Sequence, residues 1–359
     1  MSGGPPPAPR HGGDVYAAAQ RWGLSPEALL DFSANLSPFG PPAGALRAVR
    51  AGLDMVRHYP APLAPSLRAE LARRWQVPAD NLAVGNGAAE LIYLVARLAA
   101  GRRALIPQPS FGEYARAVAA SGGKAQDWPL QRQRGFLPDL DRLASDLDQV
   151  SLVLLCNPHN PSGAWLSPAG IVALTNSTPA YVVVDEAFID FAPDGEAGSV
   201  IRAVPGRGNL IVLRSLTKFY ALPGLRVGAV VAPAELIAGW DATRDVWSVS
   251  ALAQAGALAA LADAAHARRV LAWILRERPY LLRALAMVPG LTALPSAANF
   301  VLCRSPLPAW QLQERLGPLG ILIRDCRSFT GLDAYDFRLS VRRRDENQRL
   351  IAALRQVLS

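Results

Sequence analysis

The sequence has few cysteines, few lysines and no long apolar run. Its three cysteines, Cys156, Cys303 and Cys326, are odd in number and far apart. They therefore fit neither a disulfide framework nor a paired-cysteine metal site, and they favour a reducing cytoplasm. No apolar stretch approaches membrane-spanning length, and the opening MSGGPPPAPR lacks the apolar region of a signal peptide. We therefore expect a soluble cytoplasmic protein without a metal centre.

The scarcity of lysine makes one stretch stand out. Of 37 basic residues only Lys124 and Lys218 are lysines, which leaves 35 arginines. Mutational bias accounts for such a composition, and any cation serves on a solvated face. A lysine amine, however, can lose its proton and bond to a carbonyl carbon as a Schiff base, whereas a guanidinium stays protonated. Lys218, in SLTKFYALPGLRVG, is therefore the first candidate for chemistry.

The net charge of +8 raises the possibility of nucleic-acid binding. The arginines are scattered along helix-like stretches such as RAELARRW at 68–75, and the sequence has no zinc finger, RNP motif or long basic arm. We favour a solvated arginine-rich surface, whose milder consequence is the attraction of small anionic substrates.

The order of apolar segments predicts an α/β fold. Short apolar runs at 81–85, 102–107, 151–156, 181–188 and 209–215 alternate with helix-like segments, which favours a mostly parallel sheet covered on both faces. A long helix-like stretch (251–288) then precedes the short runs LTAL, NFVLCR, GILIRD and FRLSV and a final helix. We predict an amino-terminal arm (1–45), a large domain (46–245) and a smaller carboxy-terminal α/β domain (246–359).

Three of the predicted strands end in chemically useful side chains. One runs into NPHNPSG, which carries Asn160, a second ends at Asp185, and a third runs into Ser215 and Lys218. Because parallel sheets bind ligands at the carboxyl ends of their strands, we expect these side chains to converge.

Each of these features has an ordinary structural explanation. Asp185 could simply cap a helix, and the NG turn of VGNGAAEL (84–91) could be only a turn. Together, however, they form the set that pyridoxal phosphate (PLP) needs: an amine, an acid for the pyridine nitrogen, a donor to the ring oxygen, and a helix start for the phosphate.

The motifs DEAF (185–188), SLTKFYALPGLRVG and NPHNPSG resemble those of the fold-type I PLP enzymes, the aspartate-aminotransferase superfamily, and the likeness covers nearly the whole chain from residue 11. It implies a large domain with a mostly parallel seven-stranded sheet. It also implies that Lys218 bonds the cofactor, that Asp185 and Asn160 contact its ring, and that Phe111 stacks on that ring. The phosphate would be held by Ala88, Ala89, Ser215 and Arg226.

The same resemblance implies three further features. Arg338, in DFRLSV, would bind the substrate carboxylate, and Tyr59, in RHYPAP, would reach the cofactor phosphate of a second subunit in a homodimer. Phe188 stands where many relatives carry a tyrosine, so Asn160 would become the main partner of the ring oxygen. Phe111 could equally be a core side chain.

Within the superfamily, the stretch HGGDVYAAAQRWGLSPEALLDFSANLSPFGPP (11–42) resembles the opening of the threonine-phosphate decarboxylases, with Asp14 and Ser37 at positions where asparagine is common or usual. The likeness implies that Arg324, in ILIRD, binds the substrate phosphate and that His11, Ser33 and Asn35 close over the site. Arg327 is a further phosphate candidate, and His11 could instead be an idle exposed imidazole.

The predicted reaction is decarboxylation of L-threonine O-3-phosphate to (R)-1-amino-2-propanol O-2-phosphate, for the cobalamin nucleotide-loop linker. The alternative is a histidinol-phosphate aminotransferase or a related transaminase of a phosphorylated amino acid, because the same residues serve both outcomes and only the orientation of the substrate differs. A third hypothesis is a catalytically inactive module with the PLP-enzyme fold. The presence of all four expected site residues argues against it: Lys218, Asp185, Asn160 and Arg226.

Overall fold

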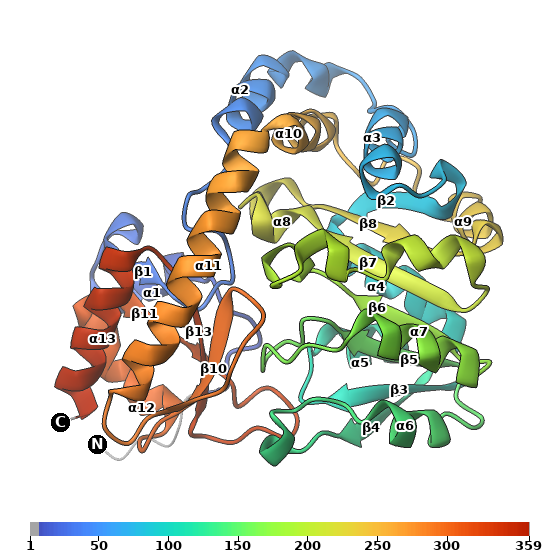
Figure 1. Cartoon of the computed structure of the whole chain (residues 1–359). Coiled ribbons are helices and arrows are strands. Elements are labelled where there is room, and N and C mark those ends of the chain that lie inside the picture. The colour runs from blue at the N-terminus through green and yellow to red at the C-terminus, as the bar shows by residue number, and fades with distance from the viewer. Residues whose placement is uncertain (1–6, 359) are drawn as a thin grey trace.

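A seven-stranded sheet forms the centre of the larger lobe in the computed structural model, which describes residues 7–358 (Figure 1). In spatial order its strands are β2 (Leu82–Asn86), β8 (Val227–Val231), β7 (Leu210–Ser215), β6 (Tyr181–Asp185), β5 (Leu152–Cys156), β3 (Arg103–Gln108) and β4 (Lys124–Pro129). Only β8 runs antiparallel to its neighbours β7 and β2, and the other pairs are parallel. The predicted mostly parallel sheet is confirmed.

Both faces of this sheet are buried, as the continuous apolar runs predict. In β6, Val182 and Val184 belong to one hydrophobic core, whereas Val183 packs into another on the opposite face. Successive side chains of a strand point to opposite faces, so a strand between two cores must be apolar at every position.

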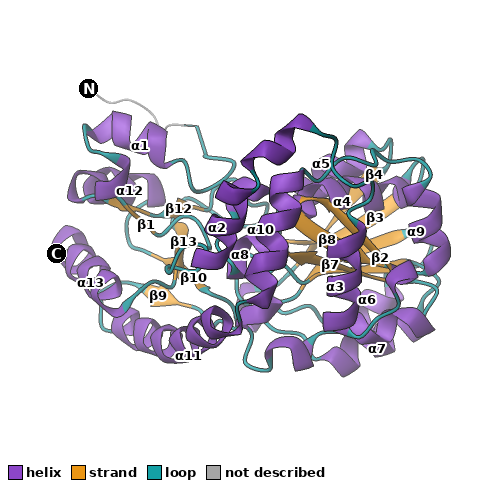
Figure 2. Cartoon of the chain, turned by 90° about the horizontal axis from the view of Figure 1, so that it is seen from above, coloured by secondary structure: helices purple, strands orange, loops and turns teal. Residues whose placement is uncertain are grey.

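Helices cover the two faces, as the view from above shows (Figure 2). In the larger lobe these helices are α2 (Ala43–Ala51), α3 (Pro65–Trp75), α4 (Gly87–Ala96), α5 (Glu113–Ala120), α6 (Leu140–Ser145), α7 (Pro168–Ser177), α8 (Leu216–Phe219), α9 (Ala234–Asp241) and α10 (Ala251–Ala262). None of the helices in residues 7–358 has the length and apolar character needed to cross a membrane.

The smaller lobe contains two short sheets. One, of order β12-β13-β10-β9, is antiparallel and consists of β12 (Arg324–Asp325), β13 (Asp336–Ser340), β10 (Phe300–Arg304) and β9 (Thr292–Ala293). The other pairs β1 (Leu30–Asp31) with β11 (Ile321–Leu322) in parallel. Around them lie α1 (Val15–Trp22), α11 (Ala264–Ala286), α12 (Ala309–Leu316) and α13 (Arg344–Leu358) (Figure 1).

Two segments that the sequence predicts to be continuous are each divided into two elements in the structure. The helical stretch 251–288 divides at Asp263, whose side chain accepts a hydrogen bond from the His266 amide and so begins α11. The GILIRD segment divides at Ile323, whose backbone N–H donates to Gln313 Oε1, so β11 and β12 join different sheets.

The amino-terminal segment packs on the carboxy-terminal lobe. Besides the β1–β11 pairing, the Phe32 carbonyl accepts the Ser340 N–H of β13 at 2.8 Å. The segment at residues 30–32 is thereby attached to β13, which carries Arg338, and to β11, which directly precedes the strand of Arg324. The three-part division at residues 45 and 245 stays a prediction.

Candidate active site

A cavity of about 270 Å³ lies where β5, β6 and β7 end. Thirteen of the fourteen predicted site residues line it: His11, Ser33, Asn35, Ala88, Ala89, Phe111, Asn160, Asp185, Ser215, Lys218, Arg226, Arg324 and Arg338. Residues from the amino-terminal segment, the large sheet and the small lobe thus meet at one place, as the strand-end argument requires.

Lys218 lies in α8, immediately after β7, and is half-buried. Burial and the neighbouring charges of Arg338 and Arg226 lower the pKa of its amine to about 8, while Asp185 acts in the opposite direction. A large fraction of the amine is therefore unprotonated in mildly alkaline solution, which is the form that attacks a carbonyl.

Asp185, at the end of β6, is held by two hydrogen bonds. The Tyr114 hydroxyl donates to Oδ2 at 2.6 Å, and the Ala187 amide donates to Oδ1 at 2.9 Å. Burial raises the pKa of Asp185, and these two bonds and the charge of Lys218 oppose that rise. The carboxylate is thus fixed in position and suited to pair with a buried cation.

The start of α4 forms a cradle for an anion. Asn86, its N-cap residue, provides no side-chain cap, which leaves backbone N–H groups at Ala88 and Ala89 beside the cavity. A Cβ at Gly87 would lie 2.3 Å from the Arg226 guanidinium, and one at Gly228 would lie 2.4 Å from the Ala88 nitrogen. Glycine at both positions therefore lets the arginine and the helix start come together.

On the opposite wall, Asn160 and Arg338 are bonded to each other. Arg338 Nη1 donates to Asn160 Oδ1, and Arg338 Nη2 donates to the Ser33 carbonyl at 3.3 Å. The bond orients the Asn160 amide so that its NH₂ group remains available to a ring oxygen. Phe188 packs edge-on against Phe300 at 4.9 Å between ring centroids and offers no hydroxyl to the cavity.

Arg324 and Arg338 stand directly opposite each other on β12 and β13. Both are buried, at 3% and 6% exposure, and burial lowers the pKa of each, that of Arg338 to about 10. Among the described residues, the hydrogen-bond partners of both guanidinium groups are neutral, namely backbone carbonyls, the Asn160 amide and the Ser328 hydroxyl. Like charges in register on neighbouring strands repel, so this pair is suited to an anionic ligand.

The amino-terminal residues cover the cavity. Arg324 donates to the carbonyls of Pro9 and Arg10 at 2.6 and 2.7 Å, and the Gly13 amide donates to Ser33 Oγ at 2.7 Å. Asn35 is buried, and its Oδ1 has no partner among the described residues. Arg10, His11 and Gly12 thus line the mouth of the site.

Tyr59, the fourteenth predicted site residue, and the further phosphate candidate Arg327 lie elsewhere. Tyr59 is 82% exposed outside the cavity, with its ring 4.9 Å from that of Trp247. This position fits an expected contact with a second subunit but leaves that contact untested. Arg327 forms an ion pair with Asp325 at 2.8 Å and does not line the cavity.

The residues present fit PLP. The uncapped start of α4 and its glycine-lined contact with Arg226 suit a phosphate, Asp185 suits a protonated ring nitrogen, and Phe111 lies in the wall of the cavity. Among the described residues Arg338 Nε is buried and has no hydrogen-bond partner, as expected of a group that binds a ligand. In residues 7–358 no cluster of three or more His, Cys, Asp or Glu side chains could hold a metal ion.

Sequence reasoning missed Tyr114, Thr217 and the arm residue Arg10. Thr217 lies 2.8 Å from Ser215 between their hydroxyl oxygens, and it lines the cavity together with Arg10. Phe111 and Tyr114 lie three positions apart at the turn that enters α5, and this spacing was a usable signal because the turn brings their rings to 5.7 Å between centroids.

Comparison with known proteins identifies the class. The family model of class I and II aminotransferases matches residues 27–354, and the chain belongs to this PLP-dependent family. A protein of Salmonella typhimurium named threonine-phosphate decarboxylase is 40% identical over 97% of this chain and 96% of its own length.

Two solved structures are also similar. The L-threonine-O-3-phosphate decarboxylase from Porphyromonas gingivalis has a TM-score of 0.81 and 30% identity, covering 91% of this chain and 98% of that one. The histidinol-phosphate aminotransferase from Sinorhizobium meliloti, solved in complex with pyridoxal-5'-phosphate, has a TM-score of 0.85 and 28% identity over 96% and 95%. The predicted superfamily and fold are confirmed.

Proposed function

We propose that this chain is a PLP-dependent decarboxylase that converts L-threonine O-3-phosphate to (R)-1-amino-2-propanol O-2-phosphate and CO₂. The observation that carries the proposal is the buried pair Arg324 and Arg338, opposite each other beside Lys218. The substrate has a carboxylate and a phosphate, so each arginine receives one anionic end. The 40% identity with the Salmonella protein supports the same substrate.

PLP, when bound, supplies an electron sink for the electrons left on the substrate α-carbon when a bond to that carbon breaks. In the proposed arrangement Lys218 bonds the cofactor, Asp185 keeps its ring nitrogen protonated, and the amide of Asn160 donates to its ring oxygen. Phe111 packs against the ring. Ser215, Arg226 and the amides of Ala88 and Ala89 hold the phosphate.

The substrate is then oriented by side chains of the small lobe. Arg338 holds the carboxylate as a fork and Arg324 holds the phosphate, with His11, Ser33 and Asn35 closing the cavity against water. Anchoring both ends fixes rotation about the bond from nitrogen to the α-carbon, and this rotation decides whether the carboxylate or the proton leaves. The amine of Lys218, with a pKa near 8, can hold or release a proton beside the α-carbon.

A test of the reaction uses purified protein with PLP and L-threonine phosphate and no keto acid. Mass spectrometry is expected to find the substrate less CO₂, and Lys218→Ala should form none. The aminotransferase alternative would instead be established if L-threonine phosphate stayed unchanged and histidinol phosphate were converted only when 2-oxoglutarate is added. The similarity to the Sinorhizobium structure supports testing this alternative.

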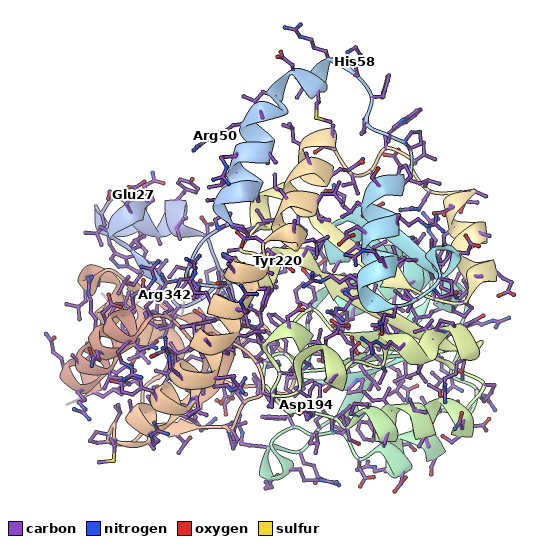
Figure 3. The ribbon with its side chains drawn as sticks, turned by 45° about the horizontal axis from the view of Figure 1, so that its top comes forward. Glu27, Arg50, His58, Asp194, Tyr220 and Arg342 are labelled. Carbon is purple, nitrogen blue, oxygen red and sulfur yellow. The ribbon has the colours of Figure 1, made fainter. Side chains whose placement is uncertain are left out.

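We further propose that the chain is a cytoplasmic homodimer that serves the cobalamin linker. The three cysteines are buried and free, which suits a reducing compartment. An apolar surface formed by Leu53, Met55, Val56, Tyr59 and Trp247 is exposed at one edge of the molecule, and we call it the edge patch. Figure 3 shows Arg50 and His58 along the same outer segment. The edge patch supports association of two copies, with Tyr59 near the other copy's phosphate site.

A further inference from the structure

The arm formed by residues 9–13 crosses the cavity mouth and is attached on both sides. On the small-lobe side it is held by Arg324 through the Pro9 and Arg10 carbonyls. Gly12 lies directly against Ser33, because a Cβ there would be 2.4 Å from the Ser33 carbonyl oxygen. On the large-lobe side the attachment runs through His11, whose Nε2 lies 3.3 Å from Glu113 Oε1.

Within residues 7–358, Glu113 contacts three partners, of which His11 is one. The same Oε1 accepts a hydrogen bond from Arg116 at 2.7 Å, and Oε2 accepts one from the Tyr93 hydroxyl of α4 at 3.0 Å. Its side chain is only 12% exposed, whereas that of His11 is 53% exposed. Glu113 is therefore the fixed member of the pair, positioned by two helices, and His11 is the member that it orders.

The position of Glu113 connects the arm to the cofactor side of the cavity. Glu113 begins α5, one residue before Tyr114, which holds Asp185, and two residues after Phe111. The His11 ring lies 6.0 Å from the Phe111 ring between centroids. His11 lines the cavity and Glu113 does not, so any effect of Glu113 on a ligand passes through His11.

We propose that Glu113 is a positioning residue, which fixes His11 over the cavity mouth and so holds the arm against the phosphate end of the substrate. The part of this proposal that concerns the substrate rests on the proposed function, whereas the docking of the arm does not. Glu113 holds the arm at His11, its middle residue, and Arg324 holds it at Pro9 and Arg10, so the loss of Glu113 frees His11 without removing an anion-binding arginine.

The first test measures arm docking without catalysis. Arg10 is the first basic residue of the chain and the next is Arg21, so trypsin cleavage after Arg10 is seen in the intact mass as loss of ten residues. The scissile carbonyl is the one held by Arg324. We expect cleavage to be about three- to tenfold faster in Glu113→Ala and His11→Ala than in the wild type, as for loss of one partly buried polar contact.

A double variant decides whether Glu113 acts through His11. In the His11→Ala background, Glu113→Ala is expected to cause no further acceleration. If Glu113→Ala fails to fold, Glu113→Gln replaces it, because glutamine has nearly the volume of glutamate. Its effect on the cleavage rate should likewise not add to that of His11→Ala. The matched control is Glu70→Ala, which removes another glutamate paired with an arginine three residues on, in α3, and should leave cleavage unchanged. Additive effects, or wild-type cleavage in Glu113→Gln and Glu113→Ala, would overturn the proposal.

The second test concerns the substrate. For L-threonine phosphate we expect KM to rise about three- to tenfold in Glu113→Ala with a smaller change in kcat, because binding of the phosphate end is weakened. An unchanged KM alongside faster cleavage would overturn the link to the substrate. If the wild type does not turn over L-threonine phosphate, the proposed function fails, while the cleavage data still decide whether Glu113 positions His11.

Discussion

Lys218 carries an ionisable amine at a half-buried position, and its protonated form therefore lowers the stability of the folded protein. Because burial and two arginines lower the pKa of its amine to about 8, the cofactor-free folded state binds fewer protons than the unfolded state between about pH 8 and the ordinary lysine pKa near 10.5. In that window stability rises with pH, and below it the protonated amine destabilises the fold.

The Lys218→Met variant makes this effect measurable. Without cofactor, we expect Lys218→Met to be more stable than the wild type at pH 7, by roughly 1–3 kcal/mol, and the difference to shrink as pH approaches 10.5. Thermal unfolding of both proteins at several pH values reports the difference, so other groups that titrate in this range cancel. A difference that does not change with pH would contradict the lowered pKa.

Tyr114 holds Asp185, the acid that we propose faces the cofactor ring. Removal of its hydroxyl in Tyr114→Phe leaves Asp185 with one fewer donor, and the pKa of that carboxyl rises further. We expect PLP to bind about tenfold more weakly or worse, since a hydrogen bond to a charged group contributes roughly 1.5–3 kcal/mol. The acid limb of the pH–rate profile should move to higher pH.

A PLP titration followed by absorbance measures this change. The matched control is Tyr181→Phe, which removes a hydroxyl at the other end of the same strand, β6. Equal affinities in Tyr114→Phe and the wild type would mean that Asp185 does not depend on the Tyr114 bond.

Among the elements, the close contact between β8 and the start of α4 sets the geometry of the proposed phosphate cradle. In Gly228→Ala the added Cβ would meet the Ala88 nitrogen, so strand and helix must separate. We expect PLP affinity to fall by about tenfold or more, because a small displacement weakens several amide contacts together.

The control is Gly239→Ala, at an exposed helical position of α9 with no atom within 4 Å of the added Cβ. It should leave PLP affinity unchanged and raise stability by roughly 0.5–1 kcal/mol. Normal PLP affinity in Gly228→Ala would show that the cradle tolerates the displacement.

At the scale of the whole molecule, the edge patch predicts association of two copies. We expect the wild type to have twice the chain mass in solution, and Val56→Asp to weaken the dimer and lower PLP occupancy by removing the partner's Tyr59 contact. Val56 is 69% exposed, and Met287, which is 70% exposed and lies after α11, provides the matched control Met287→Asp. A monomeric wild type with full activity would contradict the predicted homodimer.

The class of fold and the identity of most cavity residues could be predicted from the sequence alone. Buried strands must be apolar throughout, and parallel strands end at one edge, so Asn160, Asp185 and Lys218 could be grouped from their positions along the chain. The sequence likewise contains the glycines near α4 and the two arginines Arg324 and Arg338, but it does not give the distances between these residues.

The contacts among these residues, by contrast, could not be predicted from the sequence. The opposition of Arg324 and Arg338 depends on the register of two strands separated by a loop, and the His11–Glu113 pair joins residues 102 positions apart. The Tyr114 bond to Asp185 spans 71 positions. Such contacts follow from the packing of whole elements, which local sequence patterns do not encode, and for that reason the supporting residues around the site emerged only from the fold.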